Sequence, residues 1–464
     1  MRVFFIVTLI ALLSFSCQLH SQQDHELKLA DKYFTKFLLY GVRHDFTPRT
    51  ISKERKFLLR AKMHIDNAEA HLTKFTKWDV SSFWYLKTQI YKSLYDNDLH
   101  SLWKKNMSHS VAERTVSTDY LQVSCRATLE LIKLNYCEEL NHAGTSVVNQ
   151  PKELCSIYGS VYASLERQVA IQDSIGNHSS ALNCAIICFE MSKELNRRDF
   201  IYPEEKSDRN FHSAGEKIEP DVLSAMRVVK NSRILHYYDT ALVYCYEIEA
   251  INGTGFMKDE IFDVLLNQKK DTAAAKIYLN KVFHHYKTEK SNKSAEKTLC
   301  EYVKICLLTS DTLSADIAIL ENQKIKDNRC EPNAFMAIDY FSYALKDLED
   351  LQTGKGFFSV IQNDEDTSVA DPLVFVPATK RALALAGRVP IYCDVQTEMI
   401  YFKSLIHFWR AKEFKTNPTK YDASVNWKSE AQQALVGLDV LPSKGYGQEA
   451  RELREAINTL MNEK

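Results

Sequence analysis

The chain has 464 residues, a mass of 53.5 kDa and a formal net charge of −1, with 45% hydrophobic and 26% charged residues. This balance excludes a wholly disordered chain and a protein with many membrane spans. It also gives no indication of a polyanion binder, which needs a basic surplus or a basic stripe. The 13 glycines and 10 prolines are few for this length. They argue against a sandwich, barrel or propeller, whose tight turns use both residues, and they favour long helices.

Residues 1–21 have the pattern of a secretory signal peptide: a basic start, an apolar run over 3–15 and small residues after it. The run is too short to cross a bilayer, which takes about 20 apolar residues. Cleavage before Cys17 would leave that residue N-terminal and lipidated, as in bacterial lipoproteins, although Ser14 stands where such a motif usually has Leu. Cleavage after residue 21 would leave a soluble chain that begins at Gln22. Both alternatives place the protein outside the cytoplasm, in the periplasm, at the outer membrane or secreted.

The 11 cysteines contain no C-x-x-C pair, so the spacing indicates neither a zinc ribbon nor a thioredoxin-like motif. Most lie within apolar helical patterns and are expected to be buried. Cys184 and Cys188 share a helix face, but no neighbouring ligands complete a metal site around them. Cys155, Cys330 and Cys393 lie near breaks in the pattern and are the better candidates for disulfides.

Apolar residues that recur at steps of three and four predict amphipathic helices along most of the chain. The clearest stripes begin at Leu58, Trp84, Ala181, Ala275, Val395 and Ala450. Because the helices are separated by short polar turns, we expect antiparallel pairs that bury their apolar faces by stacking on neighbouring pairs. The predicted fold is therefore all-α.

The polar breaks divide the chain into five predicted parts after residue 21. These are a helical region over 22–196, a linker over 197–220, a second helical region over 221–350, an irregular segment over 351–377 and a C-terminal helical region over 378–464. Within the irregular segment, residues 357–361 and 373–376 are expected to be short and extended.

Two kinds of motif resemble the tetratricopeptide repeat. Trp84-x3-Thr88-x2-Tyr91 is similar to its first-helix signature W-x3-G-x2-Y, with Thr in place of Gly, and the stretch 177–182 followed by Phe189 is similar to its second helix. Further starts of the second kind lie at 239–242 and 271–274. The 34-residue period and the closing Pro are not kept. The resemblance is to degenerate repeats over about residues 55–345. It implies a right-handed solenoid of stacked helix pairs in a bacterial envelope protein and carries no chemistry of its own.

No motif in the sequence points to catalysis, since H-E-x-x-H, G-x-S-x-G and the P-loop are all absent. We therefore expect no catalytic, metal or cofactor residues. The oxygen-rich loop 363–371 lacks the Gly and terminal Glu of an EF-hand, so we interpret it as an acidic loop. His284 and His285 with Glu289 supply too few ligands for a metal and are interpreted as a solvated helix face.

Aromatic residues give the most specific functional hypothesis. Trp84, Tyr85 and Tyr91 are crowded on one predicted helix and are candidates to line a partner-binding groove. The favoured function is a secreted or lipid-anchored scaffold that binds a protein or peptide, without catalysis. We expect no nucleic-acid partner and contact with the membrane only through an N-terminal lipid. The sequence does not indicate the oligomeric state. Two alternatives remain: a carbohydrate-binding outer-membrane lipoprotein resembling the SusD type, and a helical hydrolase or lyase with scattered catalytic residues.

Overall fold

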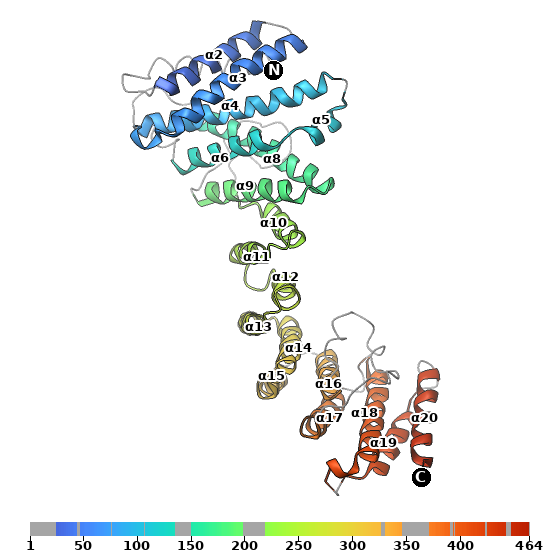
Figure 1. The fold of residues 1–464 in the computed structure, drawn as a ribbon. Coiled ribbons are helices and arrows are strands. Elements are labelled where there is room, and N and C mark those ends of the chain that lie inside the picture. The colour runs from blue at the N-terminus through green and yellow to red at the C-terminus, as the bar shows by residue number, and fades with distance from the viewer. Residues whose placement is uncertain are drawn as a thin grey trace. The chain divides into compact units, whose positions relative to one another are not determined.

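A computed structural model describes residues 25–43, 47–75, 77–105, 107–134, 150–197, 219–325, 330–345, 371–389, 393, 395–422, 425–441 and 447–463. These residues form eighteen α-helices and no β-strand, which confirms the all-α prediction. The chain divides into two compact units, Met1–Gly253 and Thr254–Lys464, and Figure 1 shows the helices of each unit packed side by side. The expected signal peptide, Cys17, the extended segment at 357–361 and most of the linker 197–220 lie outside the described residues.

The helices of the first unit are α2 (His25–Arg43), α3 (Pro48–Glu69), α4 (Lys77–Trp103), α5 (His109–Thr115), α6 (Asp119–Lys133), α8 (Gln150–Ser174), α9 (His178–Arg197), α10 (Val222–Ile234) and α11 (Tyr238–Asn252). Consecutive helices pack against each other, and α6 additionally contacts α9. Two apolar cores result. One lies among α2, α3 and α4, around Phe34, Leu58 and Phe83. The other joins α4 to α10 through α6, α8 and α9.

The helices of the second unit are α12 (Lys258–Asp263), α13 (Thr272–Thr288), α14 (Asn292–Leu308), α15 (Thr312–Lys324), α16 (Cys330–Ala344), α17 (Pro372–Ala386), α18 (Gln396–Thr416), α19 (Trp427–Asp439) and α20 (Gly447–Asn462). A π-helical turn over Val264–Gln268 follows α12. One apolar core runs from α13 to α20. At its centre the rings of Phe341 and Phe402 meet edge to face, with 5.5 Å between their centroids.

The same turn recurs between successive helices in both units. Gly176, His236, Lys290 and Ser310 each adopt a positive φ between 56° and 76° at the end of a helix. The next residue in each case donates its N–H to the carbonyl five residues earlier, at 2.7–2.9 Å. This left-handed C-cap satisfies carbonyls at the helix end and reverses the chain into the next helix. The helix pairs therefore share one turn chemistry.

A small buried residue occupies the same place after each of these four turns and after a fifth turn at Lys270, whose φ is 57°. The first residue after each positive-φ residue accepts, at its carbonyl, the N–H of an alanine four residues later that is at most 1% exposed; these alanines are Ala181, Ala241, Ala275, Ala295 and Ala315. A methyl group at this position lets the backbones of two helices approach closely. The caps Asp271 and Asp311 are 40 residues apart, so this helix pair is longer than 34 residues.

The expected extended segment at 373–376 is wrong, because α17 begins at Pro372. The carboxylate of Asp371 accepts the N–H of Leu373 at 2.9 Å, and Pro372 fits the first helical turn, where its missing N–H costs nothing. Phe375, Ala378 and Ala382 then form a buried stripe at helical spacing. An aspartate that we interpreted as part of an acidic loop is a helix cap.

The alanine position can be tested within α13, where Ala275 is buried and Ala273 is exposed. We expect Ala275→Leu to force the neighbouring helices apart and to lower the free energy of unfolding by about 1–3 kcal/mol. Ala273→Leu, in the same helix, should change it by less than about 0.5 kcal/mol. Urea titration followed by circular dichroism measures both. Equal effects at the two positions would show that close approach at Ala275 does not limit packing.

Candidate functional site

The three aromatic residues expected to line a groove lie on α4 but do not form an exposed platform. Trp84 and Tyr85 are half-buried and Tyr91 is buried. The Trp84 ring meets Phe83 edge-on at 4.8 Å between centroids. The Tyr91 hydroxyl donates to Asp66 Oδ1 at 2.6 Å, and burial together with this carboxylate raises the pKa of the phenol. The bond to Asp66 joins Tyr91 to α3, whereas the cited ring contact of Trp84 lies within α4, and the role of these residues in a groove stays a prediction.

Lys87 connects these aromatic residues to α3. Its ammonium lies 5.4 Å from the Trp84 ring centroid and 5.9 Å from that of Tyr91, and it donates to Glu69 Oε1 at 2.6 Å. The lysine is almost fully buried. A buried cation needs such compensation by a carboxylate and by ring faces. The cluster therefore serves the packing of α3 on α4.

The surroundings of the cysteine and histidine candidates indicate structural roles. Cys184 and Cys188 are buried free thiols, and burial raises the pKa of Cys184 to about 11. Cys393 is disulfide-bonded, as its position suggested. His285 Nε2 lies 3.8 Å from Glu289 Oε1. Among the described residues, no group of three His, Cys, Asp or Glu side chains is arranged to hold a metal ion.

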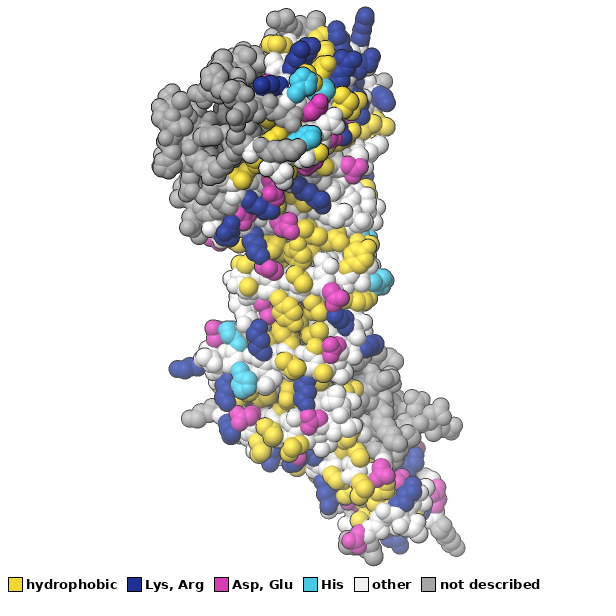
Figure 2. Space-filling model, turned by 60° about the vertical axis from the view of Figure 1, so that its left-hand side comes forward, with side chains coloured by type: hydrophobic (Ala, Val, Ile, Leu, Met, Phe, Trp, Pro, Cys, Tyr) yellow, Lys and Arg dark blue, Asp and Glu magenta, His cyan; other side chains and the backbone are white. Residues whose placement is uncertain are grey.

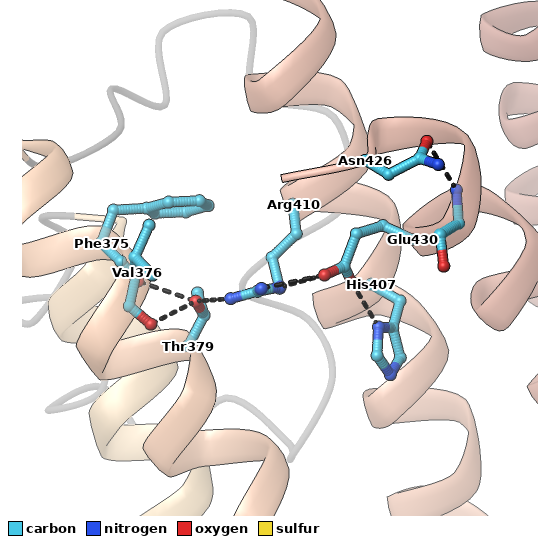
Figure 3. Close-up of polar contacts among 8 residues, drawn as sticks. Phe375, Val376, Thr379, His407, Arg410, Asn426 and Glu430 are labelled. Atoms are coloured by element: carbon cyan, nitrogen blue, oxygen red, sulfur yellow. Dashed lines mark hydrogen bonds and ion pairs between the residues drawn. The ribbon is translucent and has the colours of Figure 1, made fainter. Parts of the chain in front are cut away.

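A buried polar network in the second unit joins three helices (Figure 3). Arg410 of α18 donates from Nε and Nη2 to Glu430 Oε1 of α19, at 3.0 and 2.8 Å, and from Nη1 to Thr379 Oγ1 of α17, at 2.8 Å. His407 Nδ1 donates to Glu430 Oε2 at 2.6 Å. Burial opposes the charge on Glu430, but the hydrogen bonds from His407 and Arg410 lower its pKa.

The composition of this network resembles that of a general acid–base pair, but its geometry does not. The Glu430 carboxylate that would orient His407 is also bound by Arg410, and the Thr379 hydroxyl donates to the carbonyl of Phe375 at 2.7 Å. Among the described residues, no hydrogen bond joins a nucleophile to the His407 imidazole. The network holds α17, α18 and α19 together, and no pattern in the sequence indicates this role.

An exposed apolar stripe on the second unit is the strongest candidate for a functional surface. Leu313, Ile317 and Leu320 of α15 are 73%, 53% and 57% exposed, and Ile277 of α13 is 74% exposed. We call these four residues the α15 stripe. The opposite face of α15 is buried through Ala315, Ala318, Ile319 and Asn322, so this helix is apolar on two sides. Figure 2 brings this side of the unit forward, and hydrophobic side chains are visible along its middle.

Ion pairs hold the helices that carry the α15 stripe next to each other. Lys276 of α13 pairs with Asp311 at the start of α15, and Lys287 pairs with Glu321 at 2.8 Å between Nζ and Oε2. These contacts place α13 and α15 parallel. Arg381 of α17 pairs with Asp316 of α15 at 2.7 Å. All the acidic side chains of α15 are thereby neutralised, whereas Lys281 of α13 and Lys380 of α17 are exposed without a carboxylate partner among the described residues.

Other surface features carry less information. A shallow depression of about 600 Å³ lies along α20 and is lined only by residues of that helix and its end: Glu455, Asn458, Thr459, Asn462 and Glu463. None of the helices that the structure describes combines the length and the apolarity needed to cross a membrane. No protein-family model matches the chain, and neither does any curated protein.

The α15 stripe was missed by the sequence analysis, although a signal was present. Leu313, Ile317 and Leu320 recur at steps of four and three, which is the spacing of a single helix face. Ala315, Ala318 and Ile319 of the same segment form a second face. When one apolar stripe is expected per helix, all apolar residues of this segment are assigned to the core. Two apolar stripes on opposite faces indicate instead that one of them is exposed.

Arg410→Met tests the structural role of the polar network. The substitution leaves Glu430 in a buried position without its guanidinium partner, and we expect the free energy of unfolding to fall by about 3–5 kcal/mol. The double variant Arg410→Met/Glu430→Leu removes both charges and should recover part of this loss. Arg454→Met is the matched control, because Arg454 forms an exposed pair with Asp439 at 2.7 Å and should cost less than about 1 kcal/mol. Chemical denaturation of the full chain compares the three variants.

Two buried carboxyl groups predict a pH dependence of stability. Burial raises the pKa of Glu54 in α3 and of Asp339 in α16 to about 7, with Lys304 opposing the shift at Asp339. A carboxyl whose pKa is higher in the folded state stabilises the fold at acidic pH, and this stability is lost as the pH rises from about 4 through 7.

We expect the thermal midpoint of the native chain to fall between pH 5 and pH 8, with each group contributing at most about 3 kcal/mol. Glu54→Gln and Asp339→Asn remove one titration each, so each should flatten the dependence over this range. Differential scanning calorimetry at the two pH values measures it. A slope that neither variant changes would exclude these groups as its origin.

Proposed function

We propose that this protein is a non-catalytic helical-repeat scaffold that binds a protein or peptide partner. The single observation that carries the proposal is the α15 stripe, four large aliphatic side chains that are more than half exposed on two neighbouring helices. Contiguous exposed apolar surface on a folded unit is typical of protein interaction sites. The side chains of His407, Arg410, Glu430 and Thr379 are hydrogen-bonded to one another, which supports a structural role for this network.

The repeat is proposed to be of a degenerate tetratricopeptide-like kind. Support comes from the recurring left-handed turns and from the buried alanine at one fixed position of the following helix. Small residues at the contact between paired helices are what the resemblance implies. The 40-residue spacing of Asp271 and Asp311 makes this pair longer than the family's period of 34 residues.

The charges around the α15 stripe favour one kind of occupant. Lys281 lies one helical turn after Ile277 on α13 and Lys380 precedes Arg381 on α17, both exposed and without a carboxylate partner among the described residues. The carboxylates of Asp316 and Glu321 are engaged with Arg381 and Lys287. A partner that presents an apolar centre and an acidic rim would pair with both features. We therefore propose a protein surface or amphipathic peptide helix of that composition, in preference to a second copy of this chain.

An extracytoplasmic location is part of the proposal. The signal-peptide pattern of residues 1–21 supports export, with either a lipid on Cys17 or a soluble chain from Gln22. The disulfide at Cys393 is consistent with an oxidising compartment, where such bonds persist.

Substitution of the stripe tests the proposed function. The variant Leu313→Gln/Ile317→Gln/Leu320→Gln changes only exposed side chains and keeps good helix formers, so the fold should be retained. We expect the affinity for the partner to fall at least tenfold, because buried aliphatic residues at an interface each contribute substantially. The partner is taken from cross-linked extracts of the source cells, and its affinity for the native and variant chains is measured by biolayer interferometry.

The control variant is Val436→Gln/Val440→Gln, which removes exposed apolar residues of α19 and the residue after it. A captured protein supports the proposal only if the control retains it, the α15 variant loses it and Lys281→Glu/Lys380→Glu weakens its binding. Capture that all variants share would contradict the proposal. So would a dimer that the α15 variant abolishes, or binding to a glycan array without any protein capture, which would favour the carbohydrate-binding alternative.

A further inference from the structure

The first two helices carry a dense row of cations on their exposed faces. Lys28, Lys32 and Lys36 are spaced by four residues on α2, and Arg49, Lys53, Lys56 and Arg60 are spaced by four, three and four on α3. These spacings place each set on one face of its helix. All seven side chains are exposed. We call them the basic face, and Figure 2 shows Lys and Arg side chains gathered over these N-terminal helices.

Aromatic contacts show that the two rows of the basic face lie next to each other. The Lys36 ammonium and the Arg60 guanidinium lie 5.2 and 5.6 Å from the ring centroid of Tyr33. Lys53 lies 4.6 Å from the ring centroid of Tyr40. One row comes from α2 and the other from α3, and both tyrosines belong to α2. The rings therefore bridge the helices and hold the cations on a common surface.

No acidic side chain neutralises this surface in the described part of the chain. Among the described residues none of the seven cations forms an ion pair; three carboxylates of α2 and α3 are paired elsewhere, while burial raises the pKa of Asp31 and Glu54. Glu26 binds His64 at 2.7 Å, Asp66 binds Lys62 at 2.7 Å, and Glu69 binds Lys87 at 2.6 Å. The overall charge of −1 therefore conceals a local row of seven exposed cations, which the net charge does not indicate.

Two features of the chain favour a lipid surface as the occupant. The exposed apolar side chains Leu59 and Met63 adjoin Arg60 on α3, and a row of cations with neighbouring apolar groups is typical of segments that rest on a bilayer. In addition, α2 begins at His25, eight residues after Cys17. Eight residues span at most about 28 Å, so a lipid on Cys17 would hold the basic face close to the bilayer.

We propose that the basic face of α2 and α3 docks on an anionic lipid bilayer. A single lipid chain anchors a protein only marginally, and a basic patch is a common second contribution to stable attachment. Each Lys or Arg near an anionic leaflet adds attraction that salt screens. The proposal does not depend on the proposed function, since the basic face lies in the first unit and the α15 stripe in the second.

Vesicle sedimentation tests the proposal with the chain that begins at Gln22, which keeps every described residue and lacks any lipid. The probes are vesicles of phosphatidylcholine alone and vesicles with about 30% phosphatidylglycerol. We expect binding to the anionic vesicles only and a marked decrease between about 50 and 300 mM NaCl. Lys28→Gln/Lys32→Gln/Lys36→Gln should weaken partitioning about 100-fold, on the basis of the usual contribution per lysine.

The matched control is Lys293→Gln/Lys420→Gln/Lys428→Gln, which removes the same total charge from exposed positions of the second unit that lie outside the α15 stripe and its cations. It should bind anionic vesicles as the native chain does. Equal binding to both vesicle types, or equal weakening in the two variants, would overturn the proposal. Tighter binding to duplex DNA or heparin than to anionic vesicles, lost in the α2 variant, would also overturn it by assigning the face to a polyanion. If the α2 variant loses vesicle binding but still captures the protein partner, the basic face and the α15 stripe bind independently of each other.

Discussion

Each helix of this chain can bury its apolar face only against a neighbouring helix, and the distance between neighbours is limited by the smallest residue at their contact. The alanines that follow the left-handed turns, such as Ala181 and Ala295, provide that close approach. Because the turn fixes where the next helix begins, the alanine falls at the same place in each pair. The packing of both units depends on this combination of turn and small residue.

The interior contains charged groups, but their surroundings indicate mechanical roles. Arg410 bonds to Thr379 and Glu430 and so connects α17, α18 and α19. Removing one partner of such a network leaves the other charge buried, which makes the network a strong constraint on helix packing. Lys87 has a comparable position between α3 and α4. Polar residues in the core of a stacked helical protein can therefore resemble a catalytic set in composition while they hold neighbouring helices together.

The sequence predicted the helices well, because stripes such as Leu58–Ala61–Ile65 depend only on helical spacing and burial. Prediction from the sequence was wrong where the same residue type can have either of two structural roles. Asp371 was assigned to an acidic loop, yet its carboxylate caps α17, since a cap is recognisable only once the following helix is known. The contacts of Trp84 with Phe83 and of Tyr91 with Asp66 are not encoded in the spacing of these residues, and the groove expected at them stays a prediction. The α15 stripe and the basic face were not predicted, because apolar spacing was interpreted as core and charge was averaged over the whole chain.

The distribution of acidic residues explains how a nearly neutral chain presents cationic surfaces. Asp221, Asp271, Asp311 and Asp371 accept backbone N–H groups at helix starts, where the positive end of the helix dipole favours a carboxylate. Others, such as Glu69 and Glu321, neutralise lysines that lie between helices. These carboxylates are engaged in local structure, whereas the seven cations of the basic face form no ion pair among the described residues. Net charge is therefore a poor guide to the surface of this chain, since several helix starts and inter-helix lysines engage its acidic residues.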